Sequence, residues 1–258
     1  MQTLNEIPLS LKILKNPPSK LFFKGNDKLL DSPHKIAIVG TRKPNPYTKT
    51  FVATLAHKIT QMGGIIVSGG ALGVDIIAHT HAFPHTIMFS PSSLDIIYPK
   101  NNAKMIRQMM ERALVLSEYE SPYEPQRYSF LERNRLVIAL SEYVIIPQAD
   151  LHSGSMQSAL IAQKLGKPLY VLPHRIGESE GTNSLLAQGK AQAIYDISSF
   201  VASIFGINPS HNEENDEILQ FCKNNPSFEE AFARFGDKLY EYELEGKIIR
   251  ESGGIRVL

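Results

Sequence analysis

The sequence predicts an α/β fold, a doubly wound parallel sheet followed by a small second domain. Short β-rich runs, almost continuously apolar, alternate with segments of helical spacing, which is typical of parallel sheets covered on both faces. Turns bearing glycine, arginine or serine follow several of these runs, where the ligands of such sheets bind. Three helical segments and a two-stranded pattern then close the chain.

The main domain is expected over residues 32–206, after a short helical preface at residues 1–31. In the preface, Asn5–Lys15 has spaced apolar residues, and NPPS ends the pattern. Helical spacing in the main domain is clearest at 49–62 and 156–165. The runs that predict its strands are KIAIVG (35–40), GIIVSG (64–69), TIMFS (86–90), ALVLSEY (113–119), YVIIPQA (143–149) and PLYVLP (168–173).

The C-terminal part is expected to form a winged-helix-like domain at 216–258, joined by a linker at 207–215. GINPSHNEEND carries the Gly, Pro, Asn and acidic residues of a linker. Helical segments EILQFCKNN, PSFEEAFARFG and DKLYEYELEGK precede KIIRESGGIRVL, a hairpin pattern. From Glu213 onwards the chain has 11 acidic and 6 basic residues, a net charge of −5. Because phosphates repel such a surface, we expect this domain to contact proteins rather than DNA.

Composition restricts the class of protein. The 258 residues include one cysteine, Cys222, so neither an internal disulfide nor a cysteine metal cluster is expected. No apolar stretch reaches the roughly 18 residues of a membrane span, and the first residues lack the apolar core of a signal peptide. We therefore expect a cytoplasmic protein without a membrane span.

The charge distribution indicates a local attraction for phosphate. The net charge is +1, but no acidic residue occurs between Ser32 and Val74, where several lysines and Arg42 lie. A basic region of this kind attracts phosphate groups. Chance clustering on a solvated face is the alternative.

The glycine turn in SGGALGVDIIAH (68–79) predicts an anion site. Ser68, Gly69 and Gly70 lie between a strand and a helix start, where backbone N–H groups and a hydroxyl can meet a polyanion at close range. A tight turn without a ligand is the alternative. No Lys-Ser/Thr pair follows, which excludes a phosphate-binding P-loop, and no acid ends the second strand to hold a ribose. We expect no cofactor.

Basic residues follow the first strand. Arg42 and Lys43 precede two prolines, which stiffen the loop, and a planar guanidinium suits phosphate. Arg42 is therefore predicted to bind phosphate, with a structural ion pair to Asp75 as the alternative.

RYSFLERNR (127–135) is the segment most typical of nucleic-acid binding. Arg127 and Phe130 are predicted to hold a phosphate while a base stacks on the ring. Arg133 and Asn134 either join them or, with Arg135, form a buried structural network.

A serine-rich helix start in HSGSMQSA (152–159) is a weaker candidate. Ser153 and Ser155 are expected to cap the helix, with phosphate binding as a second role for Ser155. Lys164, nine residues further on, is predicted to reach the same rim.

No catalytic or metal-binding residue is predicted. Asp75 and His79 are four residues apart on one helical face, which suits an acid–base pair, but a structural role is favoured. His79, His81 and His85 lack the regular spacing of metal ligands.

The motifs, taken in order, resemble the DNA-processing protein A (DprA/Smf) family of bacterial natural transformation. They are GTR (40–42), SGGALGVDIIAH, YPKNN (98–102), LSEY (116–119), FLERNRLVIALS (130–141), SGSMQSA (153–159) and GTNSLL (181–186). The resemblance covers about residues 35–190. Two departures concern loop geometry: Tyr47 is not followed by glycine, and PYEPQRYS lacks the usual glycine before Phe130.

The resemblance implies a Rossmann-like domain that binds and protects single-stranded DNA, allowing weaker binding of double-stranded DNA. It also implies a homodimer that loads the RecA recombinase, and no catalysis. The alternative is an enzyme, a nucleotide phosphoribohydrolase of the lysine-decarboxylase-like group. Such enzymes carry a PGG-x-GT-x-x-E motif with a catalytic glutamate, whereas SGGALGVD has none. A scaffold with a vestigial pocket, which would not bind DNA, is a third reading.

Overall fold

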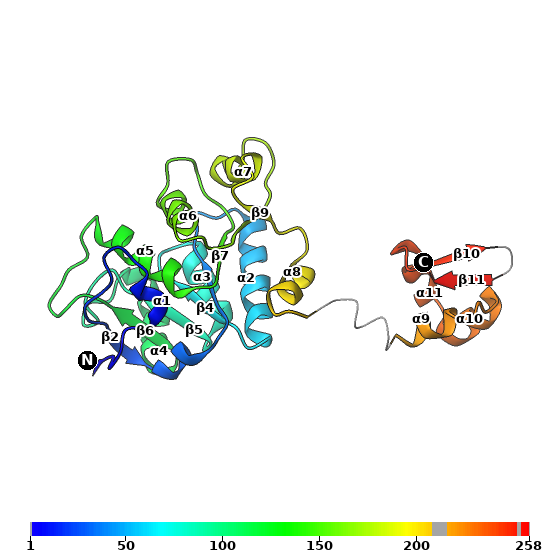
Figure 1. Cartoon of the computed structure of the whole chain (residues 1–258), viewed down its shortest axis with the longest axis horizontal. Coiled ribbons are helices and arrows are strands. Elements are labelled where there is room, and N and C mark those ends of the chain that lie inside the picture. Colours follow the sequence, from blue (N-terminus) through cyan, green and yellow to red (C-terminus); the bar gives the residue numbers. More distant parts are fainter. Residues whose placement is uncertain (1, 208–215, 252–253, 258) are drawn as a thin grey trace. The chain divides into compact units, whose positions relative to one another are not determined.

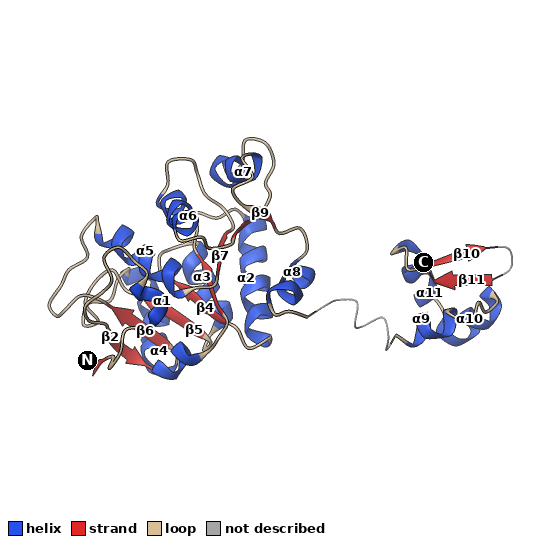
Figure 2. Ribbon diagram, viewed as in Figure 1, coloured by secondary structure: helices blue, strands red, loops and turns tan. Residues whose placement is uncertain are grey.

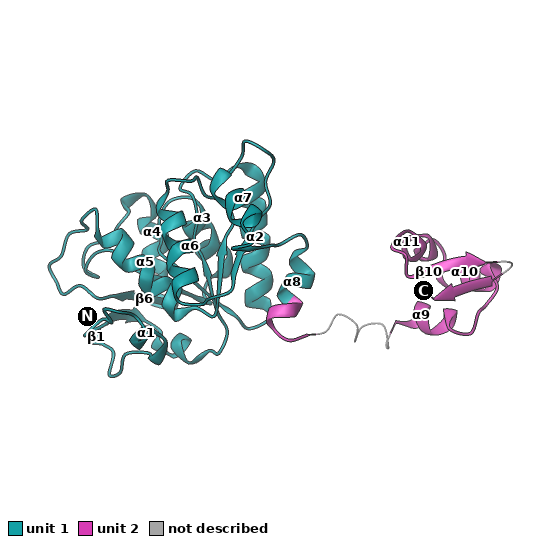
Figure 3. Cartoon of the chain, turned by 45° about the horizontal axis from the view of Figure 1, so that its top comes forward, with its two compact units in different colours: residues 1–201 teal, residues 202–258 magenta. Residues whose placement is uncertain are grey.

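Two compact units make up the chain, residues 1–201 and residues 202–258 (Figure 3). The computed structural model describes residues 2–207, 216–251 and 254–257. Most of the linker expected at 207–215 therefore lies outside the described residues, as does the Ser252–Gly253 turn of the expected hairpin. Of the helices that the structure describes, none is long and apolar enough to cross a bilayer.

A nine-stranded sheet, counted over the described residues, forms the centre of the first unit (Figures 1 and 2). Its strands are β1 (Gln2–Thr3), β2 (Phe22–Gly25), β3 (Lys35–Ile38), β4 (Ile65–Ser68), β5 (Thr86–Phe89), β6 (Leu114–Ser117), β7 (Tyr143–Ile146), β8 (Leu169–Val171) and β9 (Gln192–Ala193). They are ordered β1-β2-β6-β5-β4-β3-β7-β8-β9. Strands β3 to β9 pair in parallel, so the predicted doubly wound α/β fold is confirmed.

The N-terminal residues differ from the expected helical preface. Strand β2 pairs antiparallel with β6, Phe22 opposite Ser117, and β1 pairs with β2. Only Leu9–Lys12 (α1) is α-helical before residue 31, followed by the 3₁₀ helix η1 (Asp27–Asp31). The segment thus extends the sheet, because the apolar pair Phe22 and Phe23 is buried against it.

Helices cover both faces of the sheet (Figure 2). They are α2 (Pro46–Gln61), α3 (Val74–Ala82), α4 (Ala103–Arg112), α5 (Ser129–Leu140), α6 (Gly154–Lys164), α7 (Glu180–Ala187) and α8 (Ile197–Ile204), with the 3₁₀ helix η2 (Lys100–Asn102) before α4. Helices α1, α5 and α6 pack on one face. Helices α2 and α3 pack together on the other, where α4 covers β2 and β6.

The strand order reverses beside β3, which lies between β4 and β7. Ala37 of β3 is opposite Val67 on one side and Val144 on the other. The connection after β3 leads to β4 on one side, and the connection after β7 leads to β8 on the other. The loops that follow these two neighbouring strands therefore diverge and leave a crevice between them. Asn45 caps helix α2, which follows the loop after β3: its side chain accepts a hydrogen bond from the Thr48 N–H (2.8 Å). The crevice is where a doubly wound sheet binds its ligands.

The second unit has the element order expected from the sequence. It contains α9 (Glu217–Cys222), α10 (Phe228–Phe235), α11 (Lys238–Leu244) and the antiparallel strands β10 (Ile248–Glu251) and β11 (Gly254–Val257). Asp216 accepts from the Ile218 and Leu219 N–H groups and so caps α9. A separate apolar core includes Cys222 and Leu239, both buried.

Candidate nucleic-acid interface

Two adjoining cavities open at the carboxyl ends of β3, β4, β5 and β7. Their volumes are about 40 Å³ and 240 Å³, smaller than the roughly 300–1,000 Å³ of typical small-molecule and cofactor sites. The cavities are surrounded by loops 39–42, 69–72 and 91–99 and by the starts of α5 and α6. Arg42, Phe130 and Arg133 line both. The cavities are therefore one continuous crevice, suited to part of a ligand that continues outside it.

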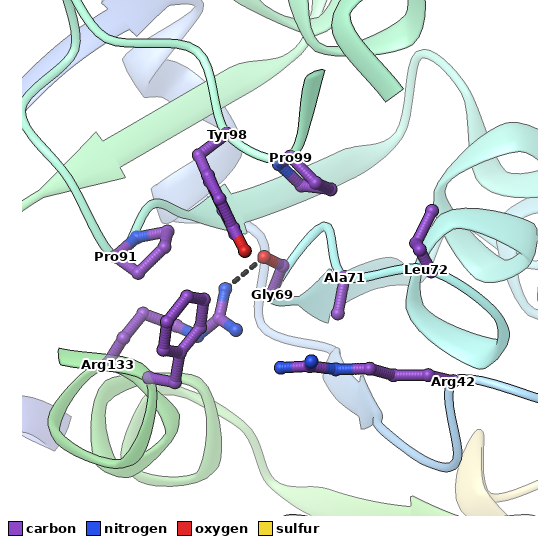
Figure 4. Close-up of a pocket in the computed structure, with 9 residues that line it drawn as sticks. Arg42, Gly69, Ala71, Leu72, Pro91, Tyr98, Pro99 and Arg133 are labelled. Carbon is purple, nitrogen blue, oxygen red and sulfur yellow. Dashed lines mark hydrogen bonds between the residues drawn. The ribbon is translucent and has the colours of Figure 1, made fainter. Parts of the chain in front are cut away.

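Arg133 binds the backbone of the glycine turn at Gly69 from the interior of the protein. This buried guanidinium of α5 donates to the backbone oxygen of Gly69 and, at 2.7 Å, to that of Phe89 (Figure 4). A side chain at position 69 would overlap the guanidinium, so any larger residue there would have to displace Arg133. The buried network that the sequence left as an alternative for Arg133 is the one observed.

The first loop rests on the glycine turn. The Val74 N–H, at the start of α3, donates to the Thr41 oxygen (3.1 Å), and the Thr41 N–H donates to the Gln148 oxygen (2.9 Å). Gly73 has a φ of 80° and lies so close to Thr41 and Arg42 that a side chain there would overlap their backbone. Close contact between these loops fixes where Arg42 leaves the backbone.

Arg42 is an exposed cation at this crevice. No described residue forms an ion pair with it, so the predicted alternative of a salt bridge to Asp75 is not observed. Its guanidinium carbon lies 5.6 Å from the centre of the Phe130 ring. Phe130 is in turn 5.4 Å from the ring of Tyr98. Figure 4 shows Arg42 on one side of the cavity and Tyr98 and Pro99 on the other. A phosphate and a flat base would both find partners here.

Asp75 corrects the prediction of a backbone anion cradle. Its buried carboxylate accepts from the Ala71 N–H (3.4 Å), and the N–H groups of Gly40 and Gly69 also favour its charged form. Burial raises the pKa of Asp75, while Arg133 opposes that shift. An internal carboxylate thus takes the Gly69 N–H, a donor that the sequence assigned to a ligand.

His79 and Arg133 are buried together with Asp75 beneath the crevice. Burial lowers the pKa of Arg133 to about 10, so it remains charged at neutral pH. Burial and the Arg133 charge lower the pKa of His79 to about 3, which keeps the imidazole neutral. His79 Nδ1 lies 2.7 Å from the Thr86 hydroxyl, which itself donates to the Ile66 oxygen. His79 is therefore a donor in the core rather than a group facing the crevice.

A helix start adds positive potential to the crevice. Helix α6 begins at its edge, where Ser153 accepts from the Met156 N–H (3.3 Å) as predicted for a cap. Ser155 and Gly154 line the larger cavity beside it. The amino-terminal end of α6 lies at the crevice, and aligned peptide dipoles favour anions at such an end, whereas the first turn of α3 already carries the Asp75 carboxylate.

Six of the residues predicted to bind DNA line the crevice, and five do not. Those that line it are Arg42, Gly69, Phe130, Arg133, Asn134 and Ser155. Ser68 requires correction: its hydroxyl is buried and donates to the Ile38 oxygen (2.6 Å). Gly70 lies behind the crevice, and its oxygen accepts from Asn102 (2.9 Å).

The remaining cations lie outside the crevice. Lys43 and Arg127 are exposed beside it but are not among its lining residues. Lys164 is in the last turn of α6, and nine residues of helix separate it from Ser155 by about 14 Å. It does not share the rim.

Tyr98 and Pro99 line the smaller cavity and were not predicted as site residues. They belong to the YPKNN motif, which served only to identify a family resemblance. The motif follows the third predicted strand, and ligands of such sheets bind beyond strand ends. That position could have identified Tyr98 and Pro99 as site residues.

The chain is similar in sequence and fold to known proteins. Residues 2–205 match the family described as DNA recombination-mediator protein A. The DNA processing protein DprA of Bacillus subtilis (strain 168) is 35% identical over 206 residues, covering 75% of this chain and 69% of that protein. Protein Smf of Synechocystis sp. is 29% identical over 222 residues, covering 83% of this chain and 56% of Smf.

Two solved structures share the fold at informative identity. One is the structure of DNA processing protein A from Helicobacter pylori, solved to describe its single-stranded DNA binding mode. It has a TM-score of 0.79 and 57% identity, and the match covers 80% of this chain and 95% of that chain. DprA from Streptococcus pneumoniae has a TM-score of 0.71 and 31% identity, covering 76% and 70%.

Proposed function

The chain belongs to the DNA recombination-mediator protein A family, and from that premise we propose that it binds single-stranded DNA in the crevice. The observation that carries this proposal is Arg42, an exposed guanidinium without a carboxylate partner among the described residues, placed 5.6 Å from the Phe130 ring. Arg42 binds a backbone phosphate, and the aromatic pair Phe130 and Tyr98 contacts the adjoining base.

Backbone and stacking contacts give affinity with little sequence preference, because every base has a flat face. The same family membership supports a role in which the protein protects incoming DNA during transformation and delivers RecA to it as a homodimer. The single-stranded DNA named for the Helicobacter pylori structure is consistent with the proposed ligand.

Fluorescence anisotropy with labelled oligo-dT, over a salt series, tests the proposal. Wild type should bind at low salt and weaken as salt rises, since phosphate contacts release counterions. Arg42→Ala should lose about tenfold or more in affinity and lower the salt slope by about 0.7, the value of one single-strand phosphate contact. Arg256→Ala, which removes an equal charge from the second unit, is the matched control. No binding by wild type at low salt would overturn the proposal.

A further inference from the structure

We propose that the DNA strand leaves the crevice along helix α4, over a cationic stripe formed by Lys100, Lys104 and Arg107. The proposal rests on the proposed function and adds a second, outer part to its binding site. The stripe would bind phosphates of nucleotides that the crevice does not hold.

The three cations are close together at the start of α4. Lys104 and Arg107, three residues apart, share one face of α4, Lys100 lies in η2 directly before that helix, and all three side chains are exposed. The opposite face is apolar: Ile106 and Met109 are buried against the sheet. None of the three cations has an ion-pair partner among the described residues. Their charges are thus available to an external anion.

The stripe begins at the wall of the crevice. Lys100 directly follows Pro99, which lines the smaller cavity opposite Arg42 (Figure 4). Two residues later, the buried Asn102 side chain donates to the Gly70 oxygen (2.9 Å) and fixes the start of α4 to the glycine turn. A backbone that crosses the crevice from Arg42 to Pro99 therefore meets Lys100 next.

Length and composition indicate what the stripe recognises. Lys100 to Arg107 spans about 10 Å at the rise of a helix, which adds reach beyond a crevice of limited volume. Residues 100–111 include no aromatic side chain, so this part would follow phosphates without stacking bases. Glu111, one turn after Arg107, ends the favourable charge.

Helix α6 is the competing exit, because it also starts at the crevice. Its sequence GSMQSALIAQK carries one cation, Lys164, in the last turn. Helix α4 offers cations from its first turn onwards, so it is the better path for a polyanion.

The test compares two oligo-dT lengths, a short one of about 3 nucleotides, matched to the crevice, and a long one of about 20 that extends well beyond it. The variant is Lys100→Gln/Lys104→Gln/Arg107→Gln. At about 100 mM salt it should bind the long oligonucleotide at least about fivefold more weakly, with a salt slope lower by about 2, the sum for three single-strand phosphate contacts. Its affinity for the short oligonucleotide should stay within about twofold of wild type, because an oligonucleotide of that length ends before the stripe.

A matched control removes the same charge elsewhere. Lys12→Gln/Lys15→Gln/Lys20→Gln changes three exposed lysines of the N-terminal segment, next to α1 on the other face of the sheet. This control should match wild type at both lengths. A gain-of-charge variant, Glu111→Lys, extends the stripe by one turn and should tighten long-oligonucleotide binding without affecting the short one.

The outcomes separate this proposal from the proposed function. An unchanged long-oligonucleotide affinity and slope in the stripe variant would overturn the stripe, even if Arg42→Ala abolishes binding. Equal losses at both lengths would also overturn it, since the variant would then act on the crevice. If wild type binds neither length, the proposed function itself fails, and the stripe with it.

Discussion

The two units use their arginines differently. In the second unit, Arg250 donates to Glu243 (2.6 Å) and lies 4.0 Å from the centre of the Phe228 ring, while Arg256 pairs with Glu251 (3.3 Å). In the first unit, Arg42 faces a cavity and has no described carboxylate partner. An arginine whose charge is neutralised within its own unit has little left to offer a phosphate. The difference teaches that an arginine without a carboxylate partner at the wall of a cavity, rather than the number of cations, favours the first unit as the DNA-binding part.

A further contrast lies within the first unit, between buried Arg133 and exposed Arg42. Arg133→Ala would leave the buried Asp75 carboxyl and the oxygens of Gly69 and Phe89 without their partner. We expect the free energy of unfolding to fall by about 2–4 kcal/mol, because two buried backbone oxygens lose their hydrogen-bond donor. Urea denaturation followed by circular dichroism measures it.

Arg42→Ala is the matched control for that experiment. Because Arg42 is exposed and has only its cation–π contact with Phe130 to lose, its removal should change the free energy of unfolding by less than about 1 kcal/mol. If both variants leave stability unchanged, Arg133 does not support the glycine turn, and the contrast between the two arginines is lost.

Acid should affect the first unit through His79, whose folded-state pKa is about 3. A histidine in the unfolded chain titrates near pH 6.5. Below that pH the unfolded state binds more protons than the folded state, so the free energy of unfolding decreases as the pH is lowered. From pH 7 to pH 5, the His79 contribution should remove about 2 kcal/mol from the free energy of unfolding. Residues 216–258 contain no histidine, so this part of the second unit lacks the effect.

The variant His79→Asn isolates that contribution. Its free energy of unfolding, measured by urea denaturation at both pH values, should vary less by about 2 kcal/mol than that of wild type. The raised pKa of Asp75 acts in the opposite direction but is present in both chains, so it cancels in the comparison. Equal losses in the two chains would contradict a buried neutral imidazole.

Local patterns predicted the parallel sheet but not its N-terminal edge. The six apolar runs identified strands because a strand buried on both faces needs apolar residues throughout. Residues 22–25 lie in a short segment, FFKG, whose strand character depends on pairing with β6 about 90 residues away. No local spacing encodes such a partner.

The candidate site likewise contains residues that the local sequence could identify and residues that it could not. Arg42 and Phe130 could be identified because their residue types and positions after strand ends indicate phosphate and base contacts. The buried positions of Ser68 and Asp75 could not, because they depend on tertiary contacts such as that from Ser68 to Ile38. Tyr98 reaches the crevice through a loop whose path also depends on tertiary structure.

Phe130 tests whether the free arginine acts together with an aromatic face. Phe130→Ala should cost at least about 1 kcal/mol of binding free energy for oligo-dT, roughly fivefold in affinity, from lost stacking. Phe130→Leu keeps apolar volume but removes the flat ring and should lose a similar amount in the anisotropy assay. If the leucine variant binds like wild type, the ring serves packing, and Arg42 alone distinguishes the two units.

The smallest effect is expected in the second unit. Arg250→Ala/Arg256→Ala in the full chain should leave oligo-dT affinity within about twofold and the salt slope unchanged, since Glu243 and Glu251 already neutralise both cations. The substitution is not silent, because the cation–π contact of Arg250 with Phe228 contributes about 0.5–1 kcal/mol to stability at an exposed site. A salt slope lower by about 0.7 for each arginine would mean that the second unit contacts phosphates. In that case internal ion pairs do not prevent DNA binding, and the difference between the units must lie in the shape of the crevice.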